Sequence, residues 1–207
     1  MQSDSDKTEK RRKRRSRRIQ IVIIYVLIAL GLAWFFESQA TTTVIFVRHA
    51  EKATAGDVAN GMFDSNDPPL SAAGRRRVAE LTRQLVEADV VAGIDAVYAT
   101  PYKRTQQTVA PLADALKLPI NSYDASDTES VLTDILKNYK GKIILVAGHS
   151  NTVPQLIANL GASKKVPPIA EDEYDNIYLI SIPWFGKTKT IRLRYGDPYV
   201  PDSTPGG

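Results

Sequence analysis

Two histidines stand at the ends of apolar segments that are typical of β-strands, and they are the only histidines in the chain. The segment Val44–Val47 leads into Arg48 and His49, and the segment Ile143–Gly148 leads into His149. In an open α/β sheet, ligands bind beyond the carboxyl ends of the strands. The two histidines are therefore predicted to meet at one edge of a sheet and to form a single site.

A third cationic residue, Arg104, follows another predicted strand, Ala96–Ala99, in the first turn of a predicted helix. Helix amino termini favour anions, and arginine binds phosphate through a bidentate fork. Two arginines and two histidines at one point describe a phosphoryl site. No G-x-x-x-x-G-K-[ST] motif is present. We therefore expect side chains to neutralise the phosphate charge, with no metal and no cofactor.

Histidine can attack phosphorus when one ring nitrogen is unprotonated and a hydrogen bond holds the other. His49, which follows Arg48 directly, is expected to be the nucleophile and to form a phosphohistidine that water then hydrolyses. His149 is expected to act as an imidazolium. It would bind the equatorial oxygens of the transition state together with Arg48 and Arg104.

The alternation of strand-like and helix-like segments predicts an α/β protein, a three-layer α/β/α fold with a mostly parallel central sheet. Besides the strands already named, the pattern predicts strands at 118–122, 177–182 and 190–194, the last two as a hairpin. Helices are predicted at 71–88, from residue 102 to before Pro119, after the capping-box spacing of Ser126 and Glu129, and at 152–160.

The amino-terminal part of the chain has the composition of a membrane anchor. Residues 1–18 carry nine Lys or Arg and three acidic residues, and in Ile19–Phe36 Gln20 is the only clearly polar residue. A helix of this length spans roughly 27 Å, close to the hydrocarbon thickness of a bilayer. The basic flank predicts a cytoplasmic amino terminus and an exported, periplasmic or extracellular domain. Ser38-Gln39-Ala40 resembles a cleavage site, but the apolar stretch is longer than that of a signal peptide, which favours a retained single-pass anchor.

Charge and composition narrow the function classes. The net charge is +4, but the basic tail accounts for more than that, so the remainder is slightly acidic and no nucleic-acid partner is expected. The absence of cysteine excludes a disulfide scaffold, a thiolate zinc site and a cysteine nucleophile. The predicted parts are a basic cytoplasmic tail at 1–18, a transmembrane helix at 19–36, a linker at 37–42, one catalytic domain at 43–196 and a flexible tail at 197–207.

Over residues 43–183 the sequence resembles the histidine phosphatase superfamily, also called phosphoglycerate mutase-like. Four motifs in the same order carry the resemblance: Val47-Arg48-His49-Ala50, Leu70-Ser-Ala-Ala-Gly74-Arg, Tyr98-Ala-Thr-Pro-Tyr-Lys-Arg104-Thr-Gln-Gln-Thr108 and Val146-Ala-Gly-His149-Ser. The resemblance implies a compact, phosphatase-type member. It implies His49 as the phosphorylated nucleophile and Arg48, Arg104 and His149 as the phosphate pocket.

The general acid is less well defined. In mutase-like members it is a carboxylate in the loop after the third strand, which corresponds here to residues 124–129. Glu129 is the first candidate and Asp127 the second, although Glu129 could equally serve its helix cap. Glu51, close to the nucleophile, is a third candidate.

Several features of the sequence bear on functions other than that of a phosphatase. A mutase must hold water away from phosphohistidine, and the short connections here favour hydrolysis. A membrane-tethered, non-catalytic phosphate-binding module is the other alternative. Gly148-His149-Ser150 mimics a nucleophile elbow, but no histidine follows it, so a serine triad cannot form. A mononuclear metal hydrolase would need more metal ligands than two histidines that are distant in the sequence.

The expected substrate is a phosphorylated small molecule or an envelope glycan or lipid, such as a lipopolysaccharide sugar phosphate.

Overall fold

The computed structural model describes residues 2–38, 41–57, 63–88, 93–163, 165–184 and 186–201. The chain forms two compact units, Met1–Ala40 and Thr41–Gly207. Parts of the predicted linker 37–42 and of the predicted tail 197–207, namely residues 39–40 and 202–207, lie outside the described residues.

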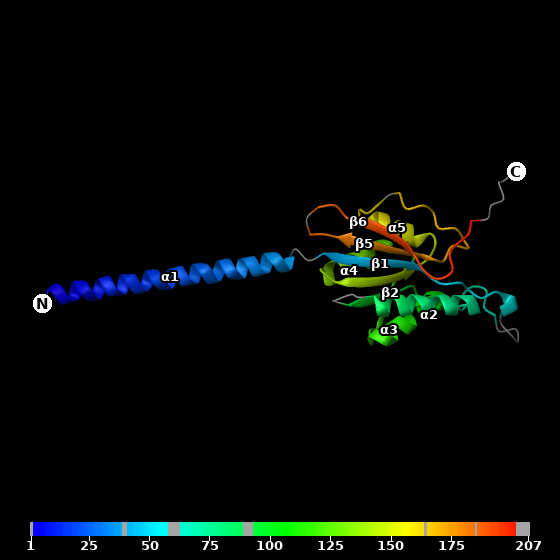
Figure 1. Cartoon of the computed structure of the whole chain (residues 1–207), viewed down its shortest axis with the longest axis horizontal. Helices are drawn as coiled ribbons and strands as arrows, with labels where there is room; N and C mark the ends of the chain where they lie inside the picture. Colours follow the sequence, from blue (N-terminus) through cyan, green and yellow to red (C-terminus); the bar gives the residue numbers. More distant parts are fainter. Residues whose placement is uncertain are drawn as a thin grey trace. The chain divides into compact units, whose positions relative to one another are not determined.

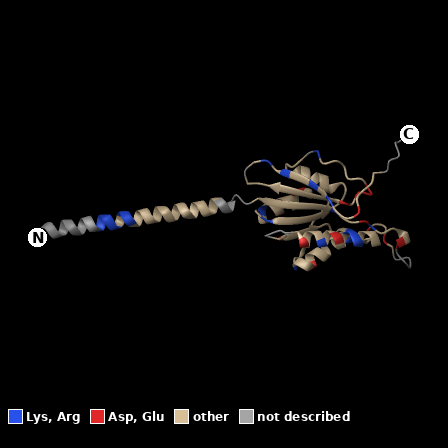
Figure 2. Cartoon of the chain, viewed as in Figure 1, with Lys and Arg blue, Asp and Glu red and all other residues tan. Residues whose placement is uncertain are grey.

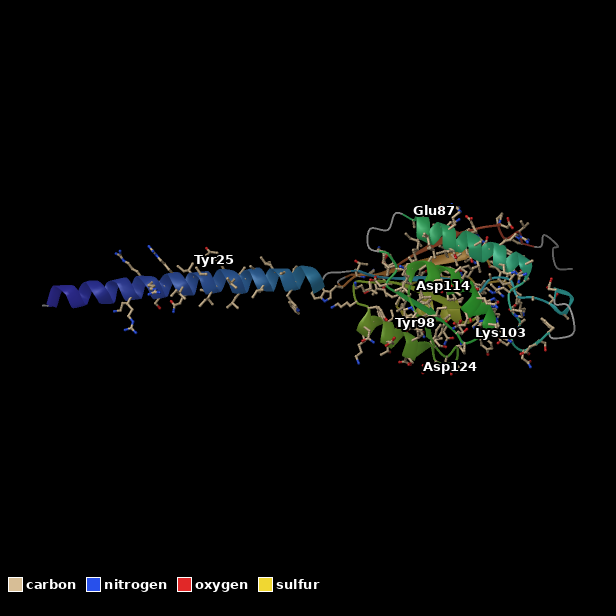
Figure 3. All side chains as sticks on the ribbon, turned by 90° about the horizontal axis from the view of Figure 1, so that it is seen from below. Tyr25, Glu87, Tyr98, Lys103, Asp114 and Asp124 are labelled. Atoms are coloured by element: carbon tan, nitrogen blue, oxygen red, sulfur yellow. The ribbon has the colours of Figure 1, made fainter. Side chains whose placement is uncertain are left out.

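The first unit contains one helix, α1, Gln2–Ser38 (Figure 1). It is longer than the predicted 19–36 because the basic block continues the same helix. Its segment Arg12–Phe35 is long and apolar enough to cross a membrane. Basic residues occupy the start of that segment and uncharged residues the rest (Figure 2). The apolar side chains, Tyr25 among them, project all around the helix (Figure 3) and are exposed, unlike those of a core helix with one buried face.

The second unit is built on a six-stranded sheet of order β3-β2-β4-β1-β5-β6. Strands β1 to β4 run parallel, β5 runs antiparallel to β1, and β5 and β6 form the predicted hairpin. The mostly parallel α/β sheet is thus confirmed. The strands are β1 Thr42–Arg48, β2 Ala96–Ala99, β3 Ile120–Ser122, β4 Ile143–Gly148, β5 Asn176–Ile182 and β6 Lys189–Arg194.

Helices follow the strands as predicted, with small shifts of their ends. They are α2 Ala72–Glu87, α3 Lys103–Leu116, α4 Thr128–Asn138 and α5 Thr152–Asn159. A short 3-10 helix, η1 Ala55–Asp57, was not predicted. Ser71 caps α2, accepting a hydrogen bond from the Gly74 amide at 3.0 Å. The predicted capping box of α4 is wrong by one residue. Asp127, not Ser126, caps the helix and accepts from the Ser130 amide at 3.0 Å.

The central strands are buried on both faces, which explains their continuous apolar sequence. Alternate residues of β1 face opposite layers, with Val44 and Phe46 on one side and Ile45 and Val47 on the other. The first side packs with apolar residues of α4 and α5, and the second with those of α2 and α3. The domain is therefore the predicted three-layer α/β/α arrangement.

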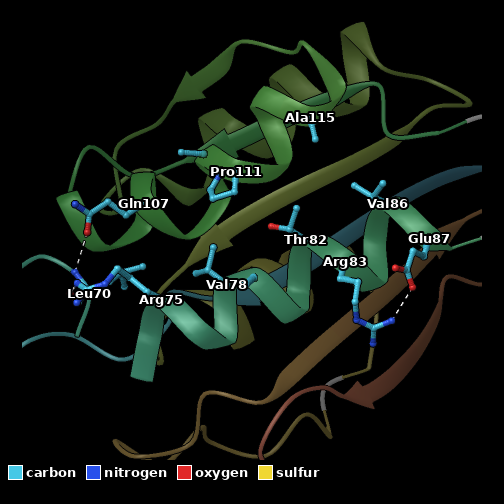
Figure 4. Close-up of a pocket in the computed structure, with 12 residues that line it drawn as sticks. Leu70, Arg75, Val78, Thr82, Arg83, Val86, Glu87, Gln107, Pro111 and Ala115 are labelled. Atoms are coloured by element: carbon cyan, nitrogen blue, oxygen red, sulfur yellow. Dashed lines mark hydrogen bonds and ion pairs between the residues drawn. The ribbon is translucent and has the colours of Figure 1, made fainter. Parts of the chain in front are cut away.

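Helices α2 and α3 leave an apolar groove of about 800 Å³ between them (Figure 4). Val78 and Val86 face it from α2, and Pro111 faces it from α3. At one end, the Leu70 amide donates to Gln107 Oε1 at 2.8 Å and ties the chain before α2 to α3. Neither histidine lines this groove.

Candidate active site

The sheet register brings the two histidines together. Arg48 at the end of β1 pairs with Gly148 at the end of the neighbouring β4, so the next residue of each strand, His49 or His149, lies at the same edge. Their ring centroids are 5.3 Å apart in an edge-on arrangement. Residues exactly one hundred positions apart therefore share one site because two parallel strands end at the same level.

His49 has the hydrogen bonding of a neutral imidazole. Its Nδ1 lies 2.8 Å from the Ala50 carbonyl oxygen. Because a carbonyl can only accept, Nδ1 carries the proton and Nε2 is left with a free lone pair. Burial, and then the positive charge of Arg48, lower the pKa of His49 to about 3. The ring, which is 4% exposed, is thus neutral at physiological pH.

Arg48 is held by a loop late in the chain, residues 170–175. Its Nη1 donates to the carbonyl oxygens of Ala170 at 2.5 Å and Glu173 at 3.1 Å. Its guanidinium lies 4.2 Å from the centre of the Tyr174 ring, and Nη2 reaches Glu171 Oε2 at 3.4 Å. The side chain is 3% exposed, and its Nε is buried without a hydrogen-bond partner within the described structure. This Nε is a donor available to an anion.

His149 is oriented by two threonines. Its Nε2 lies 3.0 Å from Thr100 Oγ1, which lies 2.6 Å from Thr105 Oγ1. The Thr105 hydroxyl donates to backbone carbonyls, so the Thr100 hydroxyl donates to Thr105 and accepts from the Nε2–H of His149. Burial, followed by the charges of Arg104 and Arg48, lowers the pKa of His149 to about 4. Burial therefore favours the neutral ring, and the imidazolium expected in the transition state stays a prediction.

Arg104 comes from the first turn of α3. Its guanidinium lies 4.4 Å from the centre of the Tyr102 ring, and Tyr102 contacts His149 edge-on at 5.3 Å between centroids. Each histidine thus has a neighbouring arginine–tyrosine stack, Arg104–Tyr102 beside His149 and Arg48–Tyr174 beside His49. The stacks leave the edge of the Arg104 guanidinium and the Nε of Arg48 to contact an anion.

These four side chains line a cleft of about 430 Å³. The Ala50 amide donates to Thr108 Oγ1 at 3.0 Å and so fixes the turn after His49 to α3. Sequence reasoning missed several residues that share the cleft, among them Lys52 and Glu171. A signal for Glu171 exists in the acidic run 171–175, which contains Tyr174, but nothing in the local sequence relates that run to Arg48. The lining residues are Arg48, His49, Lys52, Tyr102, Arg104, Ala125, Ser126, His149, Ser150, Asn151, Thr152 and Glu171.

The three carboxylates considered from the sequence lie outside the lining of this cleft. Glu129 is exposed in the first turn of α4, and the Asp127 carboxylate caps the same helix. Glu51 forms an ion pair with Arg77, with 2.8 Å between Oε1 and Nε. The structure does not bring Glu129 to the histidines because the loop after β3 meets the cleft through Ala125 and Ser126.

Comparisons with known proteins agree with this geometry. The family model for the histidine phosphatase superfamily (branch 1) matches residues 44–125. No curated protein sequence gives a significant match to the chain.

Three solved structures illustrate the fold. A mycobacterial glucosyl-3-phosphoglycerate phosphatase is 11% identical with a TM-score of 0.52, covering 68% of this chain and 90% of its own. A protein called mycobacterial hydrolase 2 is 12% identical with a TM-score of 0.55, covering 77% and 93%. A phosphoserine phosphatase from Entamoeba histolytica is 13% identical with a TM-score of 0.50, covering 75% and 97%. The chain thus matches the histidine phosphatase superfamily over residues 44–125 and shares the fold of these solved structures, and together they support a hydrolase of the phosphatase type.

Proposed function

We propose that the protein hydrolyses phosphomonoesters without a metal, through a phosphohistidine on His49. The observation that carries the proposal is the free lone pair of Nε2 on a buried, neutral His49 whose ring lies 5.3 Å from that of His149. Such a nitrogen is a nucleophile at neutral pH. Arg48 and Arg104 supply the fixed positive charge that a phosphate dianion requires.

In the proposed reaction, the phosphate binds with its oxygens facing Arg48, Arg104 and His149. Nε2 of His49 attacks phosphorus in line with the ester oxygen, the bond from phosphorus to that oxygen breaks, and the oxygen takes a proton from an acid at the open side of the cleft. The bound dianion raises the pKa of His149, because a nearby opposite charge favours the protonated ring. His149 then strengthens its hold on the phosphoryl oxygens as the transition state develops.

Water completes the proposed cycle by attacking the phosphohistidine and releasing inorganic phosphate and free His49. The open mouth of the cleft supports hydrolysis over transfer to a second substrate, since the Glu171 side chain there is 83% exposed. A mutase must exclude water at this stage. Inorganic phosphate is also the ligand in a structure of the mycobacterial neighbour, which shares the fold at 12% identity and a TM-score of 0.52.

The experiment uses the full chain in detergent with p-nitrophenyl phosphate. We expect turnover that persists with excess chelator, and a phosphorylated protein that is stable in alkali and labile in acid. His49→Ala is expected to lose both, and Lys103→Ala, which alters an exposed side chain outside the cleft, is expected to keep both. Chelator-sensitive turnover, or phosphate retained on the His49→Ala variant, would contradict the proposal. Binding without turnover would favour a non-catalytic module.

We further propose that α1 is a retained anchor with a cytoplasmic amino terminus, and that the domain is exported and acts on a phosphorylated envelope component. The basic residues before the apolar part of Arg12–Phe35 support this orientation. Neighbours named for glucosyl-3-phosphoglycerate and phosphoserine support a small phosphomonoester as the substrate class.

Cell fractionation tests the anchor separately from the chemistry. In cells expressing the full chain, protease added from outside is expected to digest residues after Thr41 and to spare an amino-terminal tag. Mass spectrometry of the membrane fraction should find peptides that span residue 40. A mature chain beginning near Thr41 would show cleavage and contradict the anchor, and screening of envelope sugar and lipid phosphates would then still define the substrate.

A further inference from the structure

Glu171 supplies the only carboxylate among the described residues that line the cleft. We propose that Glu171 is the general acid and base of the reaction: it protonates the leaving oxygen and then activates the water that hydrolyses the phosphohistidine. This inference rests on the proposed phosphatase chemistry and adds the residue that handles the proton.

The depth of the cleft sets the direction of the leaving group. The phosphate-binding end is closed, since Arg48, His49 and His149 are 3%, 4% and 8% exposed. The organic part of an ester must therefore extend toward solvent. Glu171 stands on that side with its side chain 83% exposed, and its Oε1 and Oε2 lie 3.4 Å from Ser150 Oγ and from Arg48 Nη2. The carboxylate thus bridges two sides of the mouth that the ester oxygen has to pass.

The backbone that carries Glu171 is held on both sides of it. Before it, the Ala170 carbonyl accepts from Arg48, and the Ala170 amide donates to Glu173 Oε2 at 3.1 Å. After it, Glu173 Oε1 pairs with Arg194 of β6 at 3.1 Å, and Asp175 pairs with the same guanidinium at 2.6 Å. Glu173 and Asp175 are buried. The side chain of Glu171 can change its partner while its attachment point stays fixed next to Arg48.

The other carboxylates near the site are engaged elsewhere. Asp127 accepts the capping hydrogen bond of α4, and Glu51 is paired with Arg77. The loop after β3 presents Ala125 and Ser126 to the cleft, and neither side chain can serve as a carboxylic acid. The proton donor therefore has to come from another segment, and within the described residues Glu171 is the one in place.

The proton balance of the two steps is complete. A phosphate dianion brought beside the carboxylate repels it, and protonation of Glu171 relieves this repulsion. In the first step, a bond forms from His49 Nε2 to phosphorus, the bond from phosphorus to the ester oxygen breaks, and that oxygen takes the proton of Glu171. In the second, the Glu171 carboxylate removes a proton from water, the water oxygen bonds to phosphorus, and the P–N electron pair returns to His49. The carboxyl group ends protonated, ready for another ester.

The test compares good and poor leaving groups in the full chain. Glu171→Gln is expected to lower the single-turnover rate of phosphohistidine formation from glycerol phosphate by about 100- to 10,000-fold and that from p-nitrophenyl phosphate by only a few-fold, because nitrophenolate leaves without a proton. The second step also uses Glu171, so single-turnover formation of the phosphohistidine is the readout for the first. Asp172→Asn is the matched control, an exposed acidic residue of the same loop that does not line the cleft.

Each other outcome decides against the inference. An equal loss in the rate of phosphohistidine formation from both substrates would show that Glu171 does not protonate the leaving oxygen. A gain in turnover with tighter phosphate inhibition would show that Glu171 only competes with the substrate for Arg48. A selective loss in Glu129→Gln instead would place the acid on α4. A wild-type chain without p-nitrophenyl phosphate turnover defeats the proposed function itself, whereas an active wild type with an unaffected Glu171→Gln variant defeats the role of Glu171 alone.

Discussion

Arg48 and Gly148 are paired across β1 and β4, and this pairing determines where the two histidines lie. Gly148 has no room for a side chain. A Cβ atom there would lie 2.9 Å from Thr152 Oγ1 and 3.0 Å from the Tyr123 hydroxyl oxygen. The Thr152 hydroxyl accepts from the His149 amide at 2.9 Å, so the same crowded contact positions the second histidine. The close packing around Gly148 therefore helps to hold His149 in position.

Gly148→Ala is expected to destabilise the domain by about 1–3 kcal/mol, because the added methyl group forces Thr152 and Tyr123 to move. It should also lower activity by displacing His149. Urea unfolding of the fragment 41–207 measures the first effect and phosphatase assays the second. Gly56→Ala is the control, since its nearest neighbour would be 3.9 Å away. Equal stability of the two variants would show that Thr152 and Tyr123 can move aside without a measurable loss of stability.

Tyr174→Leu is expected to weaken phosphate binding by roughly 2- to 30-fold, which corresponds to the loss of about 0.5–2 kcal/mol of cation–π interaction with Arg48. Tyr174→Phe keeps the ring and should keep the affinity. Competitive inhibition by inorganic phosphate measures the change. If both variants weaken binding alike, the hydroxyl group and not the stack positions Arg48.

Arg104→Ala is expected to lower kcat/KM by roughly 10- to 150-fold, because hydrogen bonds to charged groups contribute about 1.5–3 kcal/mol. Arg104→Lys should recover part of this loss, since lysine keeps the charge but not the planar fork. Lys103→Ala removes the neighbouring positive charge, which pairs with Asp67 at 3.8 Å, and should have little effect. A comparable loss in both alanine variants would show that the overall positive charge at the start of α3, and not a specific contact of Arg104, supports activity.

The stability of the domain should depend on pH through its histidines. Folding lowers the pKa of His49 to about 3 and that of His149 to about 4, from 6.5. Between these values the unfolded chain binds more protons than the folded one. The free energy of unfolding should therefore fall as the pH is lowered from 6.5 toward 4, by up to about 1.4 kcal/mol per pH unit for each histidine, and be independent of these groups above 6.5.

Urea unfolding of the fragment 41–207 at several pH values, with His49→Asn and His149→Asn as comparisons, tests this dependence. The carboxylates are common to all three proteins, so the difference in slope belongs to the histidines. Each variant should have a shallower slope than the wild type between pH 5 and 6.5. Identical slopes would mean that both rings bind protons in the folded state.

The sequence was most informative where local pattern and chemistry coincide. Apolar runs ending in His49 and His149 predicted neighbouring strand ends, and parallel pairing of β1 with β4 brings them together. The capping residue of α4 was missed by one position because Ser126 and Asp127 are both good caps, and the choice depends on backbone geometry.

The segment 170–175 could not be related to the site from sequence. It has no periodic pattern, and Glu171 is separated from Arg48 by more than a hundred residues, so only the folded sheet reveals their contact. The protonation state of His149 was likewise hidden, because it follows from burial among Tyr102, Thr100 and the two arginines and not from the residue type.

The last strand of the domain has a consequence for biosynthesis. Arg194 of β6 holds Glu173 and Asp175, and the loop between them and Ala170 holds Arg48 near the beginning of the domain. A nascent chain that has not yet reached residue 194 contains both histidines, but it lacks the residue that holds the loop in contact with Arg48. The contacts that hold Arg48 in position are therefore expected to be complete only when synthesis of the domain is nearly finished.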